Sequence, residues 1–495
     1  MYVFEILSEM HLTSQELSDA KGQFMQIFER ALQDSEITVR VAALKAISAF
    51  ISGIDDSSVA LEFAPVLSLL LNVIVESLQQ DEDQGRQALE SLCELTSAHP
   101  ECWKSETSKL LNVTSQVAQQ KTFEDGTRSA AIEVVLALSE KMAAPIRKAP
   151  ETKSVLFPAL VQMLMEVTTD EAEWQEEAED YQHLGTNPVS TAQSSIMRLA
   201  ADLGEKTTLV CCQPIITECV RSQTPIQRQA GYNLLGLISE TCRESYAKNL
   251  NDALQMATAG VQDQEKMVRY AALGSLAALL EHLSPDVQVK FHSELMPVLG
   301  RLMVEEPSLK MQTQATRSVL AFCQGLLTFD EDDEEAINVN GKDIMSNYAS
   351  QTLEALVAIL QRSINENHEP LQIQTLSLIG TIADVIGEDF QQYFATFIPA
   401  LVNLLTTVDG NTMEAKKLRA RAINTIGSII TSVSDNEDKA PFKANVLEIT
   451  QHLATTLQSR LSDDDPQDES IKDTLAQCAG FLGQEFVQFM PMMLD

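Results

Sequence analysis

The chain has 495 residues, of which 71 are acidic and 35 are basic, and its formal net charge is −36. Such a chain lacks the basic footprint that direct nucleic-acid binding requires, and it either attracts basic partners or simply stays soluble. Apolar residues make up 44% of the chain and aromatic residues only 5%, which suits stacked helices better than a β-sandwich. Because no apolar run reaches about 18 uninterrupted residues, we expect no membrane insertion.

Apolar residues with helical spacing come in pairs of segments along the whole chain. The predicted pairs are 22–33 with 37–54, 64–80 with 84–98, 107–120 with 125–142, 153–168 with 191–204, 207–223 with 227–242, 246–262 with 266–283, 287–305 with 309–326, 344–363 with 371–387, 390–408 with 413–433, and 442–461 with 469–486. Arg228 and Arg269 hold equivalent positions of two consecutive pairs, 41 residues apart. A period of about 40–47 residues is typical of HEAT or armadillo repeats. The sequence therefore predicts an all-α HEAT-repeat α-solenoid, a right-handed superhelix of about ten antiparallel helix pairs that runs continuously over residues 1–495.

A proline inside an apolar run recurs near the first helix of several pairs, at Pro65, Pro158, Pro297, Pro399 and Pro491. Proline either kinks a helix that is already running or begins a new one. Two turns of apolar residues precede Pro399, so we predict a bent helix over residues 390–405. The chain also begins and stops within apolar patterns, whereas solenoids finish on repeats with a polar outer face. We therefore expect an array that is truncated at both ends.

Acidic insertions interrupt the repeats near residues 170–182 and 329–336. The first holds Asp170, Glu171, Glu173, Trp174, Glu176, Glu177, Glu179 and Asp180, and the second holds Asp330, Glu331, Asp332, Asp333, Glu334 and Glu335. The indole of Trp174 can grip a cationic side chain of a partner or fix the loop on the solenoid, and the sequence leaves both interpretations open. The shorter run Asp463–Asp465 is expected to be a solvated loop.

Motifs of catalysis and metal binding are absent from the sequence. There is no H-E-x-x-H, no phosphate-binding glycine loop and no G-x-S-x-G elbow. The eight cysteines form no C-x-x-C pair and lie mostly among apolar residues, which indicates small core residues in a reducing compartment. We expect no enzyme activity, no cofactor and no metal site.

Three segments carry a family resemblance: residues 261–272 with the following Phe291 and His292, residues 481–491, and the acidic stretch around Trp174 that follows Leu164 and Met165. In this order they resemble the importin-β (karyopherin-β) nuclear transport receptors, and most closely the importin-5 (importin-β3) branch. The resemblance covers essentially the whole chain but only the central part of the family's longer array.

The resemblance implies a nuclear import receptor that moves between cytoplasm and nucleus. Its second helices would line a concave face for basic cargo proteins with import signals and for the GTPase Ran, whose main site falls outside this fragment. The first acidic insertion would trap lysine- and arginine-rich segments, and RanGTP would release them. Phenylalanine-glycine nucleoporins would insert between first helices. Candidate linings are Phe291, Leu295, Phe394 and Phe397, unless these residues are ordinary inter-repeat core. The alternative function is a HEAT-repeat scaffold that takes no part in transport, similar to a phosphatase scaffold subunit.

Overall fold

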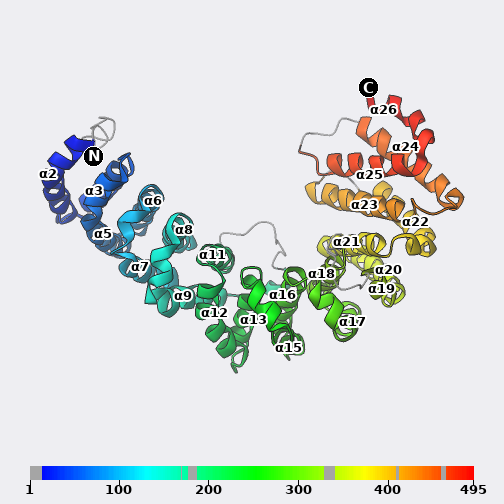
Figure 1. The fold of residues 1–495 in the computed structure, drawn as a ribbon, viewed down its shortest axis with the longest axis horizontal. Helices are drawn as coiled ribbons and strands as arrows, with labels where there is room; N and C mark the ends of the chain where they lie inside the picture. Colours follow the sequence, from blue (N-terminus) through cyan, green and yellow to red (C-terminus); the bar gives the residue numbers. More distant parts are fainter. Residues whose placement is uncertain are drawn as a thin grey trace. The chain divides into compact units, whose positions relative to one another are not determined.

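The computed structural model describes residues 14–168, 170–176, 187–327, 341–408, 412–458 and 464–494. Within these ranges the regular secondary structure is helical and contains no strand. Ten first helices and ten second helices alternate along the chain, close to the predicted bounds (Figure 1). The predicted all-α class is confirmed.

The chain divides into two compact units, each of which is a stack of helix pairs. Unit 1 comprises Met1–Asn249 and Gln262–Ser275. Its first helices are α2 (Ser14–Leu32), α5 (Leu67–Gln80), α7 (Thr107–Gln119), α9 (Phe157–Leu164) and α12 (Glu205–Val220). Its second helices are α3 (Ile37–Ser52), α6 (Glu82–Ala98), α8 (Asp125–Lys148), α11 (Pro188–Leu203) and α13 (Pro225–Leu237), followed by the first part of α16 (Lys266–His282).

Unit 2 comprises Leu250–Val261 and Leu276–Asp495. Its first helices are α15 (Leu250–Val261), α17 (Asp286–Glu305), α20 (Ala349–Asn365), α22 (Gln391–Thr407) and α24 (Ala440–Gln458). Its second helices, after the last part of α16, are α18 (Leu309–Gly325), α21 (Glu369–Ile386), α23 (Met413–Ser432) and α25 (Gln467–Leu482). In the view of Figure 1, the second helices of unit 2 lie along one side of its stack and the first helices along the other.

Short elements join the main helices. In unit 1 they are α4 (Ser57–Ala60), η1 (Leu61–Val66), η2 (Pro100–Trp103), η3 (Thr152–Leu156), α10 (Glu171–Glu176) and α14 (Arg243–Lys248). In unit 2 they are α19 (Gly341–Ser346), η4 (Gly387–Phe390), η5 (Gly483–Phe489) and α26 (Met490–Leu494). Several second helices begin at a side chain that accepts a hydrogen bond from a backbone N–H of the first turn, which satisfies one of the free donors there. These capping residues are Asp81, Asn187, Ser308, His368 and Thr412.

Consecutive pairs share one apolar core. At the start of unit 1, the rings of Phe24, Phe28, Phe50 and Phe63 pack with centroids 5.0 to 6.5 Å apart, joining the first pair to η1 of the second. Edge-to-face and tilted packing of this kind adds to the burial of the rings. No single pair encloses its own apolar face, so each pair depends on its neighbours for stability.

Basic residues near the start of several second helices tie their pair to the next one. The fourth residue of the helix is basic in α3, α8, α13, α16 and α23, namely Arg40, Arg128, Arg228, Arg269 and Lys416. Arg228 donates hydrogen bonds of 2.7 and 2.9 Å to the carboxylate of Asp263, which lies in the turn between the two helices of the next pair. The ammonium group of Lys416 lies 2.8 Å from the carboxylate of Asp465. Asp465 is only 6% exposed, so the expectation of a solvated loop is wrong for this residue. The next pair's turn docks on α23 and its carboxylate neutralises Lys416.

The recurring prolines lie both inside helices and at helix starts. Pro297 lies inside α17 and Pro399 inside α22, so Gln391–Thr407 form one helix that runs through its proline, and the bend of this helix stays a prediction. Pro158 lies in the first turn of α9. The missing N–H of proline is tolerated there, because backbone N–H groups of the first turn have no partner within the helix. Pro65 lies in η1, directly before α5.

One segment of the described residues, Ser57–Gln80, is long and apolar enough to cross a membrane by length and composition. Its apolar residues do not form one uninterrupted run, because Glu62, Asn72 and Glu76 lie among them. Half of its most apolar window is buried, and Phe63, Leu67 and Leu70 are fully buried. Its apolar character is therefore accounted for by the core that α5 shares with its neighbours.

Candidate functional site

The first acidic insertion connects α9 to α11 and contains the short helix α10. Asp170 caps this helix, since its Oδ1 accepts hydrogen bonds from the backbone N–H groups of Ala172 and Glu173 at 2.9 and 3.0 Å. The carboxylate of Glu173 accepts a hydrogen bond from the hydroxyl of Thr168 at 2.8 Å. Two of the predicted ligand carboxylates therefore hold the local fold of the insertion.

Trp174 anchors the insertion to a distant repeat. Its side chain is 3% exposed and meets the ring of Tyr270 edge to face, with centroids 5.5 Å apart and an interplanar angle of 89°. Tyr270 lies on α16, two pairs further along the chain, in the part of that helix that belongs to unit 1. Of the two interpretations of Trp174, this burial favours a ring that fixes the loop on the solenoid over a ring presented to a partner.

The other predicted acidic residues are described only in part. Glu171 and Glu176 lie in α10, while Glu177, Glu179 and Asp180 fall outside the described residues. The second acidic insertion, Asp330 to Glu335, also falls outside them. Their role in binding stays a prediction.

A carboxylate that recurs at the end of second helices, or shortly after it, was not found from the sequence. Glu140, Glu240, Glu281 and Asp384 each follow the fourth residue of their second helix by 12 positions, and all four side chains are exposed. Glu140 and Glu240 belong to unit 1, and Glu281 and Asp384 belong to unit 2. Within each unit, equivalent positions of stacked repeats lie on the same side of the stack. The register of the basic residues could have revealed three of these acids, because Glu140, Glu240 and Glu281 each follow a basic fourth residue by 12 positions, whereas Asp384 follows Gln372.

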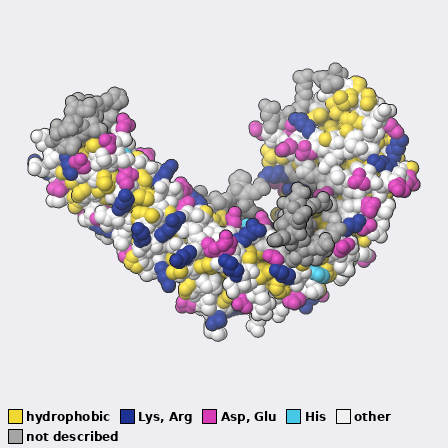
Figure 2. All heavy atoms as spheres, in the orientation of Figure 1, with side chains coloured by type: hydrophobic (Ala, Val, Ile, Leu, Met, Phe, Trp, Pro, Cys, Tyr) yellow, Lys and Arg dark blue, Asp and Glu magenta, His cyan; other side chains and the backbone are white. Residues whose placement is uncertain are grey.

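In unit 1 the row continues into a small polar network on α8 and α11. Arg198 binds Glu133 at 2.8 Å and Glu140 at 2.5 Å. Burial opposes the charge on Arg198, but the hydrogen bonds to the two carboxylates outweigh it and raise the pKa of the guanidinium. Asp202 accepts the hydroxyl of Ser139 at 2.6 Å. Figure 2 shows basic and acidic side chains intermixed over the visible surface of this unit, so its negative charge is distributed rather than gathered in one patch there.

In unit 2, Asp384 is the carboxylate with the most unusual titration. Although part of the Asp384 residue is exposed to solvent, its carboxylate is desolvated on the side that packs against α23, which raises its pKa to about 6, against a hydrogen bond from Ser428 that lowers it. An ordinary aspartate is ionised well below this pH. A cation held by Asp384 is therefore expected to bind more weakly as the pH falls below about 6.

The outer side of each unit, which its first helices form, carries an open groove. In unit 1 it lies along α12 beside Lys153, has a volume of about 730 Å³, and includes Val210 and Pro214. In unit 2 it lies between α22 and α24, has a volume of about 350 Å³, and includes Leu405 and Ile449. Val210 is 53% exposed, which makes it the more accessible apolar contact.

The residues predicted to line such grooves are placed elsewhere. Leu295, Phe394 and Phe397 are buried, and Phe291 is half-buried. Phe394 packs against Phe442 of the next first helix with centroids 4.7 Å apart. These contacts agree with the alternative interpretation, in which the aromatic residues beside the prolines belong to the core between repeats.

Cysteines and metal ligands add no reactive centre to the described residues. No three His, Cys, Asp or Glu side chains there are grouped so that they could hold a metal ion. All eight cysteines are free thiols and seven of them are buried. Burial raises the pKa of Cys102 and Cys242 to about 12, which keeps these thiols protonated and unreactive.

Comparison with known proteins identifies the family. A model described as "Importin subunit beta-1-like, TPR repeats" matches residues 240–495, which is more than half of the chain. The chain belongs to the importin-β family. Models described as "IPO5-like, TPR repeats" and "Importin repeat" match residues 1–113 and 120–210. Together, the three importin models cover almost the whole chain.

Two relatives illustrate the match. Importin subunit beta-3 of Saccharomyces cerevisiae is 22% identical over 484 residues, which cover 96% of this chain and 41% of the relative. A probable importin-5 homolog of Dictyostelium discoideum is 23% identical over 476 residues, which cover 94% of this chain and 41% of the relative. The chain thus spans about two-fifths of the length of these importins.

Solved structures share the fold. The crystal structure of Kap121p bound to Pho4p has a TM-score of 0.83 and 21% identity, covering 99% of this chain and 45% of Kap121p. The structure of Kap121p bound to Nup53p gives 0.82 and 22% over the same shares. These similarities confirm the predicted helical-repeat solenoid of the karyopherin type.

Proposed function

We propose that this chain is the central part of a nuclear import receptor that binds basic segments of cargo proteins on its second helices. The observation that carries the proposal is the exposed carboxylate that recurs 12 positions after the fourth residue of four second helices. A cargo segment rich in lysine or arginine offers positive charges to such a row. Kap121p, which shares the fold, has been crystallised bound to Pho4p, Ste12p and Ulp1p.

The charge of the chain acts mainly on the encounter. A net charge of −36 raises the local concentration of a basic ligand and speeds its association, within a screening length of about 8 Å at physiological salt. Affinity then depends on close contacts to individual carboxylates, because charges at the rim of an interface tune rates more than affinity. The first acidic insertion, fixed by Trp174, would add charge to the same unit.

The receptor would carry its cargo between cytoplasm and nucleus and release it on binding RanGTP. Ran contact by this fragment would involve the first acidic insertion, with the main Ran site outside residues 1–495. Phenylalanine-glycine segments of nucleoporins would occupy the outer grooves, where Val210 is the accessible apolar residue in unit 1. A HEAT-repeat scaffold would bind neither GTP-loaded Ran nor phenylalanine-glycine peptides, so a pull-down of the full-length protein with both separates the two functions.

The cargo site is tested by removing the carboxylates of unit 1. The variant Glu140→Gln, Asp202→Asn and Glu240→Gln keeps side-chain shape and should slow association with a lysine-rich peptide severalfold at low salt, with a smaller effect at high salt. Surface plasmon resonance at two salt concentrations measures both. Glu29→Gln on α2, an exposed acid of a first helix, controls for the loss of a charge away from the second helices. Equal association rates for both variants would refute binding at the second helices of unit 1.

A further inference from the structure

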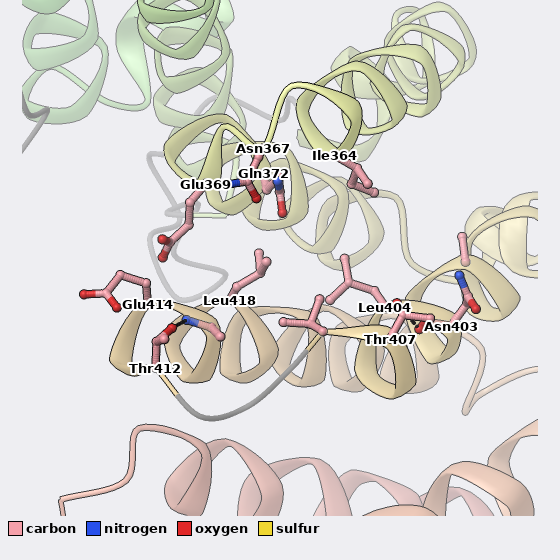
Figure 3. Close-up of a pocket in the computed structure, with 13 residues that line it drawn as sticks. Ile364, Asn367, Glu369, Gln372, Asn403, Leu404, Thr407, Thr412, Glu414 and Leu418 are labelled. Atoms are coloured by element: carbon pink, nitrogen blue, oxygen red, sulfur yellow. Dashed lines mark hydrogen bonds between the residues drawn. The ribbon is translucent and has the colours of Figure 1, made fainter. Parts of the chain in front are cut away.

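A cavity at the junction of α20–α21 with α22–α23 is not explained by the repeat architecture. It has a volume of about 450 Å³ and includes Asn367, Glu369, Gln372, Leu404, Glu414 and Leu418. In Figure 3 the carboxylates of Glu369 and Glu414 lie at one end of the cavity, and the amide of Gln372 points into it from above. Ile364, an apolar residue that is 45% exposed, lies towards the other end.

The neighbouring junction of unit 2 shows what fills the same position one repeat earlier. Gln312 and Gln372 are both the fourth residue of their second helix, where most other repeats carry arginine or lysine. Each amide nitrogen donates a hydrogen bond to a backbone carbonyl in the last turn of the preceding first helix. The distance is 2.8 Å from Gln312 to Met303 and 3.0 Å from Gln372 to Ser363. The two glutamines are therefore oriented alike.

The amide oxygens of the two glutamines differ in their hydrogen-bond partners. The oxygen of Gln312 accepts a hydrogen bond at 3.2 Å from the guanidinium of Arg362, which comes from the next first helix and also binds the carbonyl oxygens of Glu306 and Pro307. Arg362 is the fourth residue from the end of α20, and the equivalent residue of α22 is Leu404. The oxygen of Gln372 has no hydrogen-bond partner among the described residues, although the side chain is 94% buried, with 6% exposed.

The carboxylates of Glu369 and Glu414 at the cavity likewise have no direct ion-pair partner among the described residues. Burial and the nearby Glu414 raise the pKa of Glu369, and Lys417 lowers it to a smaller extent. No ion pair in the described part of the chain involves Glu369 or Glu414, whereas Arg362 pairs with Glu366 at 3.0 Å. An unpaired acceptor of a largely buried residue and two carboxylates thus line a space whose counterpart at the preceding junction holds a guanidinium.

We propose that this cavity binds an arginine side chain of a partner protein. The guanidinium takes the place that Arg362 holds at the preceding junction, donating to the Gln372 amide oxygen and to the carboxylates of Glu369 and Glu414. Its five N–H donors suit several acceptors in one plane, which an ammonium group does not match. Leu404 and Leu418 cover the aliphatic stem. The site lies wholly in unit 2 and does not depend on cargo binding by the carboxylates of unit 1.

The test uses the 495-residue chain with ¹³C-labelled isoleucine δ-methyl groups and three capped tripeptides, Gly-Arg-Gly, Gly-Lys-Gly and Gly-citrulline-Gly. Citrulline keeps the shape of arginine without its charge. We expect the arginine peptide to shift the Ile364 methyl signal saturably, the lysine peptide to bind more weakly, and the citrulline peptide to leave the signal unchanged. Equal affinity for lysine and arginine, or an Ile364 signal that does not respond, would overturn the proposal.

Two variants locate the binding. Glu414→Gln removes one exposed carboxylate and should raise the dissociation constant about fivefold, and Leu404→Arg should abolish the shift because it supplies the guanidinium from α22. Glu354→Gln, an exposed acid on α20, changes the net charge equally and should leave the dissociation constant unchanged. If Leu404→Arg does not fold, as seen from its methyl spectrum, Glu414→Gln against Glu354→Gln decides alone. The same dissociation constant in these two variants would exclude the cavity as the binding site.

Discussion

Arg128 provides the sharpest test of how the helix pairs of unit 1 are held together. It lies on α8 with 3% of its side chain exposed and binds both oxygens of Glu166, at 2.6 and 2.9 Å, and the carbonyl oxygen of Ala118 at 2.7 Å. Arg128→Met removes the guanidinium and leaves Glu166, which is 12% exposed, as an uncompensated buried charge. Breaking one partner of such a pair costs about 3–5 kcal/mol.

Lys121 reduces the expected effect. Its ammonium lies 3.9 Å from Glu166 and is 65% exposed, so it offers a weak, screened replacement. We therefore expect a loss of about 3 kcal/mol, which corresponds to an opening equilibrium of α8 and α9 that is about 100-fold more favourable. Native-state hydrogen exchange measures this locally, which suits a repeat array that does not unfold in a single step.

Arg198→Met is the matched control on the next second helix. Arg198 also binds two carboxylates, but its side chain is 39% exposed and those of Glu133 and Glu140 are 46% exposed. Exposed pairs contribute about 0.2–1 kcal/mol, so exchange around α11 should change little. If Arg198→Met accelerates exchange as much as Arg128→Met, burial does not determine the strength of these pairs and the reasoning is wrong.

Three further predictions follow from the packing and the titrating groups. Trp174→Ala should release α10 from Tyr270, seen as fast exchange of the α10 amides with little change in the unfolding midpoint, and retained protection would contradict the anchor role. Because the pKa of Asp384 is raised to about 6, folding favours its protonated form. Stability should therefore fall as the pH rises from about 4 to 6, and Asp384→Asn should flatten this part of a pH series of denaturant midpoints. Phe394→Ser should cost about 3–5 kcal/mol of stability, because it removes a buried contact with Phe442. Val210→Ser should instead weaken the binding of phenylalanine-glycine peptides, measured by interferometry, without lowering the melting temperature measured by calorimetry. The opposite pattern would mean that Phe394 is a contact for pore proteins.

The sequence determined the helix pairs, because their signals are local. Apolar spacing acts within one or two turns of a helix, and the fixed repeat period, seen in the equivalent positions of Arg228 and Arg269, multiplies this signal. The prolines were interpretable for the same reason, since Pro399 follows two turns of established apolar pattern. The acidic insertions were equally visible as composition.

The tertiary structure decided which side chains remain available to a partner. Trp174 could have faced solvent or the solenoid, and only its contact with Tyr270, almost 100 residues away, placed it in the core. Asp465 is paired because a neighbouring repeat brings Lys416 to it, and the oxygen of Gln372 is unpaired because α22 carries leucine where α20 carries arginine. Such outcomes depend on which residue of another repeat comes within hydrogen-bonding distance. The free energy of burying a charge or a ring is set by these contacts, and a single repeat read by itself does not contain them.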